Sequence, residues 1–111
     1  MTIYKIVPRA LWEEAVITGE FMGSPVDRAD GFIHFSTAEQ VHETAAKHFR
    51  GVENLLLIAF DADALGGALK WEPSRGGALF PHLYAPLPVN LAVWIKPLPL
   101  DAGGSVIMPA L

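Results

Sequence analysis

The chain has 111 residues, which fits a single domain over residues 1–111. It has no cysteine, which excludes disulfides, thiolate zinc sites and cysteine nucleophiles. The 51% of hydrophobic residues excludes a disordered chain. The formal net charge of −4 disfavours a general nucleic-acid-binding surface, which is usually basic. A local basic patch remains possible, with the candidates Arg28, Lys70, Arg75 and Lys96.

The N-terminal part of the chain predicts a strand, a helix and a loop. Residues 3–7 are mostly β-branched, aromatic or apolar and predict a strand that Pro8 ends. A helix is expected between Pro8 and Gly19, because four apolar residues follow at helical spacing: Leu11, Trp12, Ala15 and Val16. Residues 20–30 contain glycine, proline and polar groups and predict a loop.

Residues 30–37, Asp-Gly-Phe-Ile-His-Phe-Ser-Thr, predict a strand that runs directly into a second helix. Two pairs match the spacing of a capping box at its start, either Ser36 with Glu39 or Thr37 with Gln40. The buried stripe of this helix is expected to be Val41, Ala45, His48 and Phe49, with Gly51 as its end.

The second half of the chain predicts mainly strands. Residues 55–60 form a continuous apolar run typical of a central strand covered on both faces. After this run we expect a turn or short helical piece (61–67), a short strand (69–72), an aromatic loop (73–88) and a last strand (91–95). The tail is expected to add an edge strand or to lie along the surface. This order predicts an α+β domain with helices packed on a mixed sheet, and a core that includes Leu56, Ile58, Phe60, Val93 and Ile95.

The strand over residues 30–37 is the first candidate site. Strand alternation places Phe32, His34 and Ser36 on one face, just before a helix N-terminus that suits an anionic ligand. His34 is either a catalytic residue or a structural histidine with one bonded ring nitrogen. Ser36, Thr37 and Gln40 are candidates for ligand binding and equally for helix capping. Arg28, before this strand, has a guanidinium suited to a phosphate.

A second candidate cluster lies further along the chain. Trp71 and Glu72 stand on the expected short strand, and His82 and Tyr84 follow in Phe-Pro-His-Leu-Tyr. His82 is the second candidate for acid–base catalysis, and Tyr84 is placed to stack on a ring such as a base or nicotinamide. The alternative is a packed aromatic loop, with Glu72 as a solvated acid.

These motifs, Asp-Gly-Phe-Ile-His-Phe-Ser-Thr, Lys-Trp-Glu and Phe-Pro-His-Leu-Tyr, resemble a family of short bacterial proteins classed as a domain of unknown function, some of them mislabelled as glutathione S-transferase-like. The resemblance runs from Tyr4 to about Trp94. It implies an ADP-ribosyltransferase-like fold with a split mixed β-sheet flanked by helices. In such folds a histidine on an early core strand holds a ribose hydroxyl, which is the role this implies for His34. The expected last strand lacks the glutamate that many active ADP-ribosyltransferases carry there.

Two function classes follow from these observations. The first is an enzyme acting by glycosyl or phosphoryl transfer on a nucleotide-like or NAD-derived molecule, with NAD or a nucleotide as the candidate cofactor. The second is a non-catalytic module that binds a small molecule or a protein. No metal site is expected, because His42 and His48 do not share a helix face. No apolar run reaches the roughly 20 residues needed to cross a bilayer, and the start lacks signal-peptide features, so a cytoplasmic protein is expected.

Overall fold

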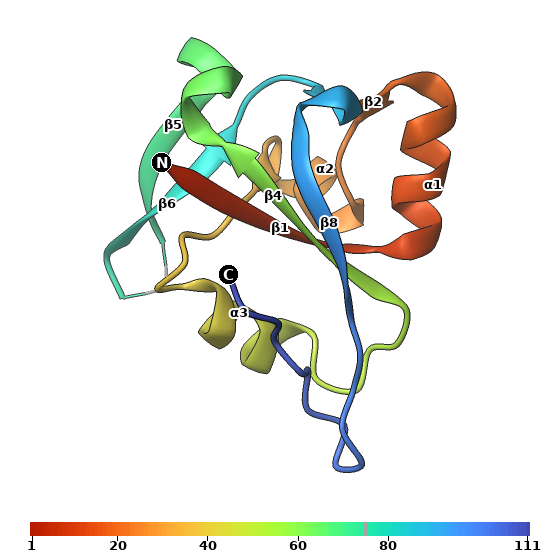
Figure 1. Ribbon diagram of the computed structural model, residues 1–111. Helices are drawn as coiled ribbons and strands as arrows, with labels where there is room; N and C mark the ends of the chain where they lie inside the picture. The colour runs from red at the N-terminus through yellow and green to blue at the C-terminus, as the bar shows by residue number, and fades with distance from the viewer. Residues whose placement is uncertain (75) are drawn as a thin grey trace.

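Strand β4 (Leu55–Asp61) is the centre of the fold, as the apolar run predicted. It lies between β1 (Thr2–Pro8) and β8 (Ala92–Leu98) in a three-stranded antiparallel sheet. Its side chains alternate between two cores, with Leu56, Ile58 and Phe60 in one and Leu55, Leu57 and Ala59 in the other. The computed structural model describes residues 1–74 and 76–111 (Figure 1), so Arg75 lies outside the described residues.

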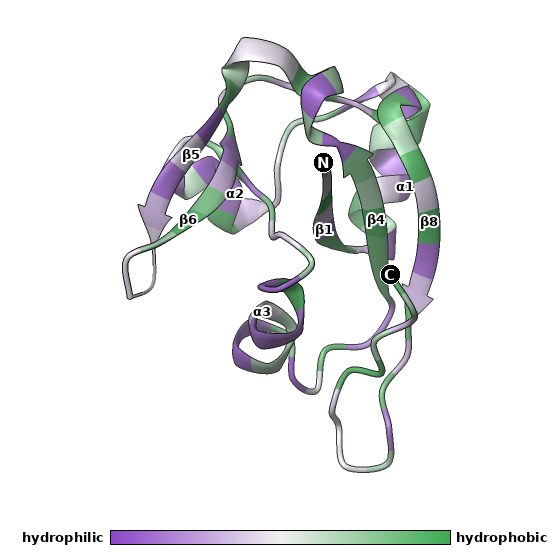
Figure 2. Ribbon diagram, turned by 60° about the vertical axis from the view of Figure 1, so that its left-hand side comes forward, coloured by the Kyte–Doolittle hydropathy of each residue, from purple (hydrophilic) through white to green (hydrophobic). Residues whose placement is uncertain are grey.

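A second sheet of three strands stands beside the first, as Figure 2 shows, and carries the candidate site. Its order is β3-β6-β5, with β3 at Ile33–His34, β6 at Ala78–Leu83 and β5 at Leu69–Ser74. A short pair joins β2 (Glu20–Phe21) to β7 (Leu87–Pro88). Every strand pair among the described residues is antiparallel, so the prediction of a mixed sheet was wrong. Neighbours such as β5 and β6 are joined by a short segment, whereas a parallel pair needs a long crossover.

In the part of the chain that the structure describes, three α-helices and two 3₁₀ segments accompany the sheets: α1 (Arg9–Thr18), α2 (Pro25–Asp30), α3 (Val41–His48), Ala62–Ala68 and Val89–Leu91. The prediction for α1 is confirmed, including its end at Gly19, which has the positive φ of 92° that glycine adopts most easily. Its inner face buries Trp12 and Ala15, while Val16 is exposed. Among the described residues, no helix is long and apolar enough to cross a membrane.

The structure corrects two loop predictions. Residues 20–30 contain β2 and α2, because Ser24 and Asp27 form a capping box and Pro25 occupies the first turn, where proline is favourable. Residues 78–83 form β6, because pairing with β3 on one side and β5 on the other holds them extended despite Pro81. The prediction of a short helical piece after β4 is confirmed by the 3₁₀ segment Ala62–Ala68.

Four smaller expectations also change. The strand predicted over residues 30–37 is reduced to Ile33–His34, after which Ser36 forms an isolated bridge with Tyr4 of β1. Helix α3 ends at His48, before Gly51, and His48 is exposed. Val93 and Ile95 on β8 are 62% and 47% exposed, because they lie outside the two clusters of buried residues that the rest of the chain covers.

Candidate functional site

His34 of β3 and His82 of β6 are paired directly across the second sheet. Since alternate residues share a face, Phe32 and Tyr84 fall on the same side as these two histidines. The Phe32 ring stacks on His82 with centroids 4.0 Å apart, and lies 4.6 Å from His34 and 5.3 Å from Tyr84. Glu72 of β5 binds His82 and Tyr84. We call Phe32, His34, Glu72, His82 and Tyr84 the histidine cluster.

The imidazole of His82 is buried and oriented by Glu72. Its Nδ1 lies 2.8 Å from Glu72 Oε1, and the residue is only 4% exposed. No hydrogen bond from a described residue reaches its Nε2. When Nδ1–H is donated to the carboxylate of Glu72, Nε2 of the neutral ring carries a lone pair that can accept a proton. His82 therefore has the arrangement of an oriented acid–base group.

The same oxygen of Glu72 accepts a second hydrogen bond, from the Tyr84 hydroxyl at 2.7 Å. The bonds from Tyr84 and then from His82 lower the pKa of Glu72, so its carboxylate stays ionised. Conversely, the bond to Glu72 raises the pKa of Tyr84, so its hydroxyl stays protonated and donating. The half-exposed Tyr84 ring is held at the rim of the cluster by this bond.

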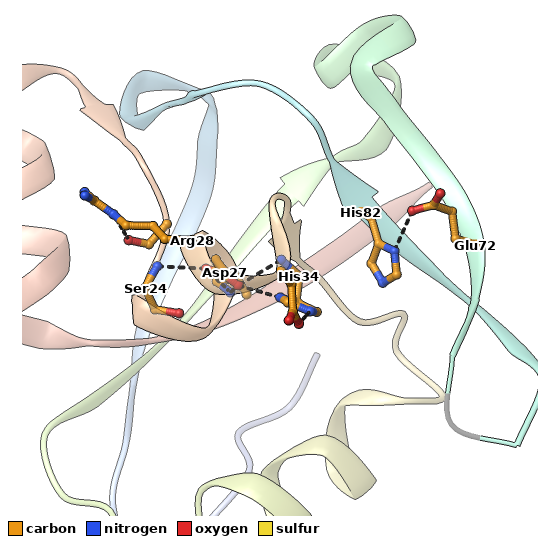
Figure 3. A network of polar contacts seen from close by, with 9 residues as sticks. Ser24, Asp27, Arg28, His34, Glu72 and His82 are labelled. Carbon is orange, nitrogen blue, oxygen red and sulfur yellow. Dashed lines mark hydrogen bonds and ion pairs between the residues drawn. The ribbon is translucent and has the colours of Figure 1, made fainter.

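His34 lies between two carboxylates. Its Nδ1 is 2.6 Å from Asp27 Oδ1, and its Nε2 is 2.9 Å from Asp30 Oδ2. Because carboxylates only accept, both contacts are hydrogen bonds only when the ring is protonated on both nitrogens. The backbone N–H of His34 also donates to Asp27, at 3.1 Å. Figure 3 shows that His34 and His82 have their carboxylate partners, Asp27 and Glu72, on opposite sides of the pair.

Asp27 anchors this part of the site from inside the protein. It is 2% exposed and lies 2.9 Å from Lys5 Nζ, and it accepts a bond from the Ser24 N–H at 2.9 Å. Burial alone would raise the pKa of Asp27, but the bond from His34, the charge of Lys5 and the Ser24 N–H together hold it well below its usual range. Burial lowers the pKa of Lys5, and Asp27 opposes that change. The carboxylate beside His34 is thus a fixed negative charge.

The predicted ligand-binding residues near α3 are engaged with the scaffold. Ser36 Oγ lies 3.0 Å from Thr44 Oγ1 of α3. Gln40 Oε1 accepts from the Thr37 N–H at 3.0 Å, as in the second of the two expected capping pairs. Gln40 Nε2 donates to the carbonyl of Leu79 at 2.7 Å and so ties α3 to the second sheet.

Neither Trp71 nor Arg28 has a hydrogen bond or ring contact with the histidine cluster among the described residues. Trp71 is opposite Pro81 in the strand register, so it points to the other face of the sheet from Glu72 and His82. Arg28 donates from Nε to the carbonyl of Gly23 at 3.3 Å. It borders an open concavity of about 300 Å³ together with Asp27, Phe32 and Tyr84. The concavity adjoins the histidine cluster, because Phe32 and Tyr84 belong to both.

A second, smaller hollow of about 90 Å³ lies between α3 and the C-terminal segment. It is lined in part by His42, and by Arg50, whose guanidinium bonds Ser105 Oγ at 2.7 Å and the Gly103 carbonyl at 3.0 Å. These bonds fasten the tail to the end of α3. In the part of the chain that the structure describes, no group of three or more histidine and carboxylate side chains is arranged to hold a metal ion.

Comparison with known proteins gives the family. The family model described as "Protein of unknown function (DUF952)" matches residues 6–95. The chain belongs to the DUF952 family. Its fold is similar to the crystal structure of protein CC0527 from Caulobacter crescentus, with a TM-score of 0.93 and 56% identity over 96% of this chain and 94% of that one. The solution NMR structure of the same protein gives a TM-score of 0.84 and 58% identity, over 94% and 90% of the two chains. Among curated proteins, none matches.

In this DUF952 chain, sequence reasoning missed the carboxylates around His34. Asp27 lies in the predicted loop, Asp30 lies where that loop meets the predicted strand, and Lys5 lies on the first predicted strand, so none of them was a candidate site residue. The spacing of Ser24 and Asp27 was a usable signal, because it matches a capping box and fixes the carboxyl of Asp27 at the start of α2. The ion pair between Lys5 and Asp27 had no comparable signal, since the two residues are 22 positions apart.

Proposed function

We propose that the histidine cluster binds a nucleotide-like or NAD-derived small molecule and performs acid–base chemistry on it. The observation that carries this proposal is His82, a buried imidazole oriented by Glu72 through Nδ1, with Nε2 on the side of the ring away from that carboxylate. A carboxylate that accepts a hydrogen bond from Nδ1–H in this way fixes the tautomer and the orientation of the imidazole. A purely structural histidine would not need a second oriented histidine 5.4 Å away.

The other members of the site have roles that suit such a ligand. Phe32 and Tyr84 offer aromatic faces on which a base or a nicotinamide ring can stack. Arg28, at the border of the concavity, has the geometry to bind phosphate oxygens. His82 is the group proposed to exchange a proton with the substrate through Nε2, and His34 is proposed to hold a polar group of the ligand.

We also propose that the chain has the ADP-ribosyltransferase-like fold that the sequence resemblance implies. Support comes from the division of the strands into separate sheets, β1-β4-β8 and β3-β6-β5. In this proposal, Glu72 of β5 supplies the carboxylate beside His82, whereas β8 carries no glutamate. NAD and ADP-ribose are therefore candidate ligands, and transfer of a glycosyl or phosphoryl group is the candidate reaction.

A second candidate is a binding module without catalysis. The contacts of His34 favour it, because both nitrogens of this ring are already occupied by carboxylates and neither is available as a base. In that case the cluster recognises a ligand by shape and hydrogen bonding alone. The two candidates differ in whether the bound molecule is converted.

A thermal-shift screen tests the proposal with NAD, ADP-ribose, nucleotides and phosphorylated sugars. At a concentration ~100 times its dissociation constant, a ligand stabilises the folded state by ~2.7 kcal/mol. We expect one compound to raise the melting temperature of the wild type and of His42→Gln, an exposed histidine on α3, but not of His82→Gln. A screen without any stabilising compound, or an equal shift in His82→Gln, would overturn the proposal. Chromatography of the bound compound after incubation separates an enzyme from a binding module.

A further inference from the structure

We infer that Nε2 of His34 is the binding position of a ligand phosphate, and that the carboxylate of Asp30 occupies this position as an internal substitute for it. The inference rests on the proposed function, since it names the group by which the same site recognises its ligand. It assigns the ligand to phosphate esters and gives Asp30 the role of a competing anion.

The two carboxylates on His34 differ in how firmly they are held. Asp27 is 2% exposed and binds Lys5 and the Ser24 N–H as well as His34. The Asp30 side chain is 48% exposed, and His34 is its only partner among the described residues. An exposed ion pair of this kind contributes little to stability, so Asp30 can be displaced at small cost, whereas Asp27 cannot. The displaceable anion lies on the Nε2 side of the ring.

His82 supplies the second observation. Its ring lies edge-on to His34 with centroids 5.4 Å apart, and its buried Nε2 receives no hydrogen bond from a described residue. Asp30 is paired with His34, and among the described residues no hydrogen bond or ion pair joins its carboxylate to His82. A tetrahedral phosphate has several oxygens and can accept bonds from two imidazoles at once. The pair of rings therefore fits a phosphate better than it fits the carboxylate that occupies part of the site.

The surroundings indicate what the phosphate is attached to. Phe32 contacts both histidine rings and also borders the open concavity with Tyr84. A group esterified to the phosphate would meet these aromatic faces first, which favours a flat ring such as a nucleobase. Adenosine monophosphate and adenosine, which differ only in the phosphate, are therefore the informative pair of probes.

The experiment follows the ring signals of His34 and His82 by NMR during titration with inorganic phosphate, at fixed pH and ionic strength. Wild type, Asp30→Asn and His34→Gln are compared, with Asp63→Asn as a control that removes the same charge from another exposed position. Removing the competing anion should tighten phosphate binding about three- to fivefold in Asp30→Asn, the equivalent of one exposed ion pair, while Asp63→Asn stays within about twofold of wild type. In His34→Gln the phosphate-induced shift of His82 should be lost.

Adenosine monophosphate should show the same gain in Asp30→Asn, and adenosine should show none. Equal phosphate affinity in wild type and Asp30→Asn, or an unchanged response in His34→Gln, would overturn the inference. The results distinguish a failure of this inference from a failure of the proposed function. Stabilisation by a nucleotide without any phosphate effect at His34 removes this inference, both the phosphate position and the role of Asp30, and leaves the proposed function in place. Saturable phosphate binding at His34 with no nucleotide bound supports the phosphate position and removes the nucleotide-like ligand.

Discussion

His34 and His82 face each other across β3 and β6, with their ring centroids 5.4 Å apart and each Nδ1 on a different carboxylate. The two carboxylates that bind these histidines have different surroundings. Asp27 beside His34 is buried and paired with Lys5, whereas Glu72 beside His82 is partly exposed and shared with Tyr84. Replacing Asp27 and replacing Glu72 should therefore have different effects.

Replacing Asp27 by asparagine should destabilise the protein by about 3–5 kcal/mol at pH 7, because Lys5 would be left buried without a counter-charge. Since the folded-state pKa of Asp27 is lowered below its unfolded value of ~3.9, its contribution is fully present above about pH 5 and is lost as the pH falls through the folded pKa. The free energy of unfolding should thus depend less steeply on pH below 5 in Asp27→Asn than in wild type. Urea unfolding at pH 7, 5 and 3 measures both effects. Equal slopes in the two proteins would show that Asp27 titrates normally.

Replacing Glu72 by glutamine should lower the pKa of Tyr84 toward its ordinary value. The carboxylate accepts the phenolic hydrogen bond and repels the phenolate, and glutamine removes that negative charge. The chain has two tyrosines, so phenolate absorbance followed as a function of pH can resolve Tyr84, with Tyr84→Phe to assign the transition. An unchanged Tyr84 titration in Glu72→Gln would mean that the hydroxyl is bonded elsewhere.

The core gives a prediction that is independent of the site. Leu56 is 4% exposed on central β4, and Val93 is 62% exposed on edge strand β8. Leu56→Ala should therefore cost ~2–5 kcal/mol of unfolding free energy, and Val93→Ala about 0.5 kcal/mol or less. Chemical denaturation of both variants tests this contrast. Similar losses for the two would contradict the exposure of Val93.

The sequence predicted α1 and β4 because their signals are local. Helical spacing of apolar residues with a final glycine defines α1, and an unbroken apolar run defines β4. The exposure of Val93 and Ile95 could not be predicted, because residue type does not reveal which face of a strand the rest of the chain covers. Strand β6 lies in a proline- and glycine-rich stretch that predicted a loop, and only pairing with β3 and β5 makes it a strand.

The candidate site was predictable to a similar extent. His34, His82 and Tyr84 were singled out by residue type, and the register of β3 with β6 brings their rings to one face. Their carboxylate partners depend on tertiary contacts. Asp27 reaches His34 only because α2 folds against β3, and Glu72 reaches His82 only because β5 pairs with β6.

Mapping a ligand onto the amide signals of the protein tests the central claim most directly. In a ¹H–¹⁵N NMR titration with ADP-ribose, we predict saturable shifts that concentrate at the histidine cluster and the adjoining concavity, above all at Phe32, His34, His82 and Tyr84. The hollow between α3 and the C-terminal segment, with His42 and Arg50, should stay unperturbed. Shifts concentrated at that second hollow, or no saturable shift at millimolar ADP-ribose, would contradict the account.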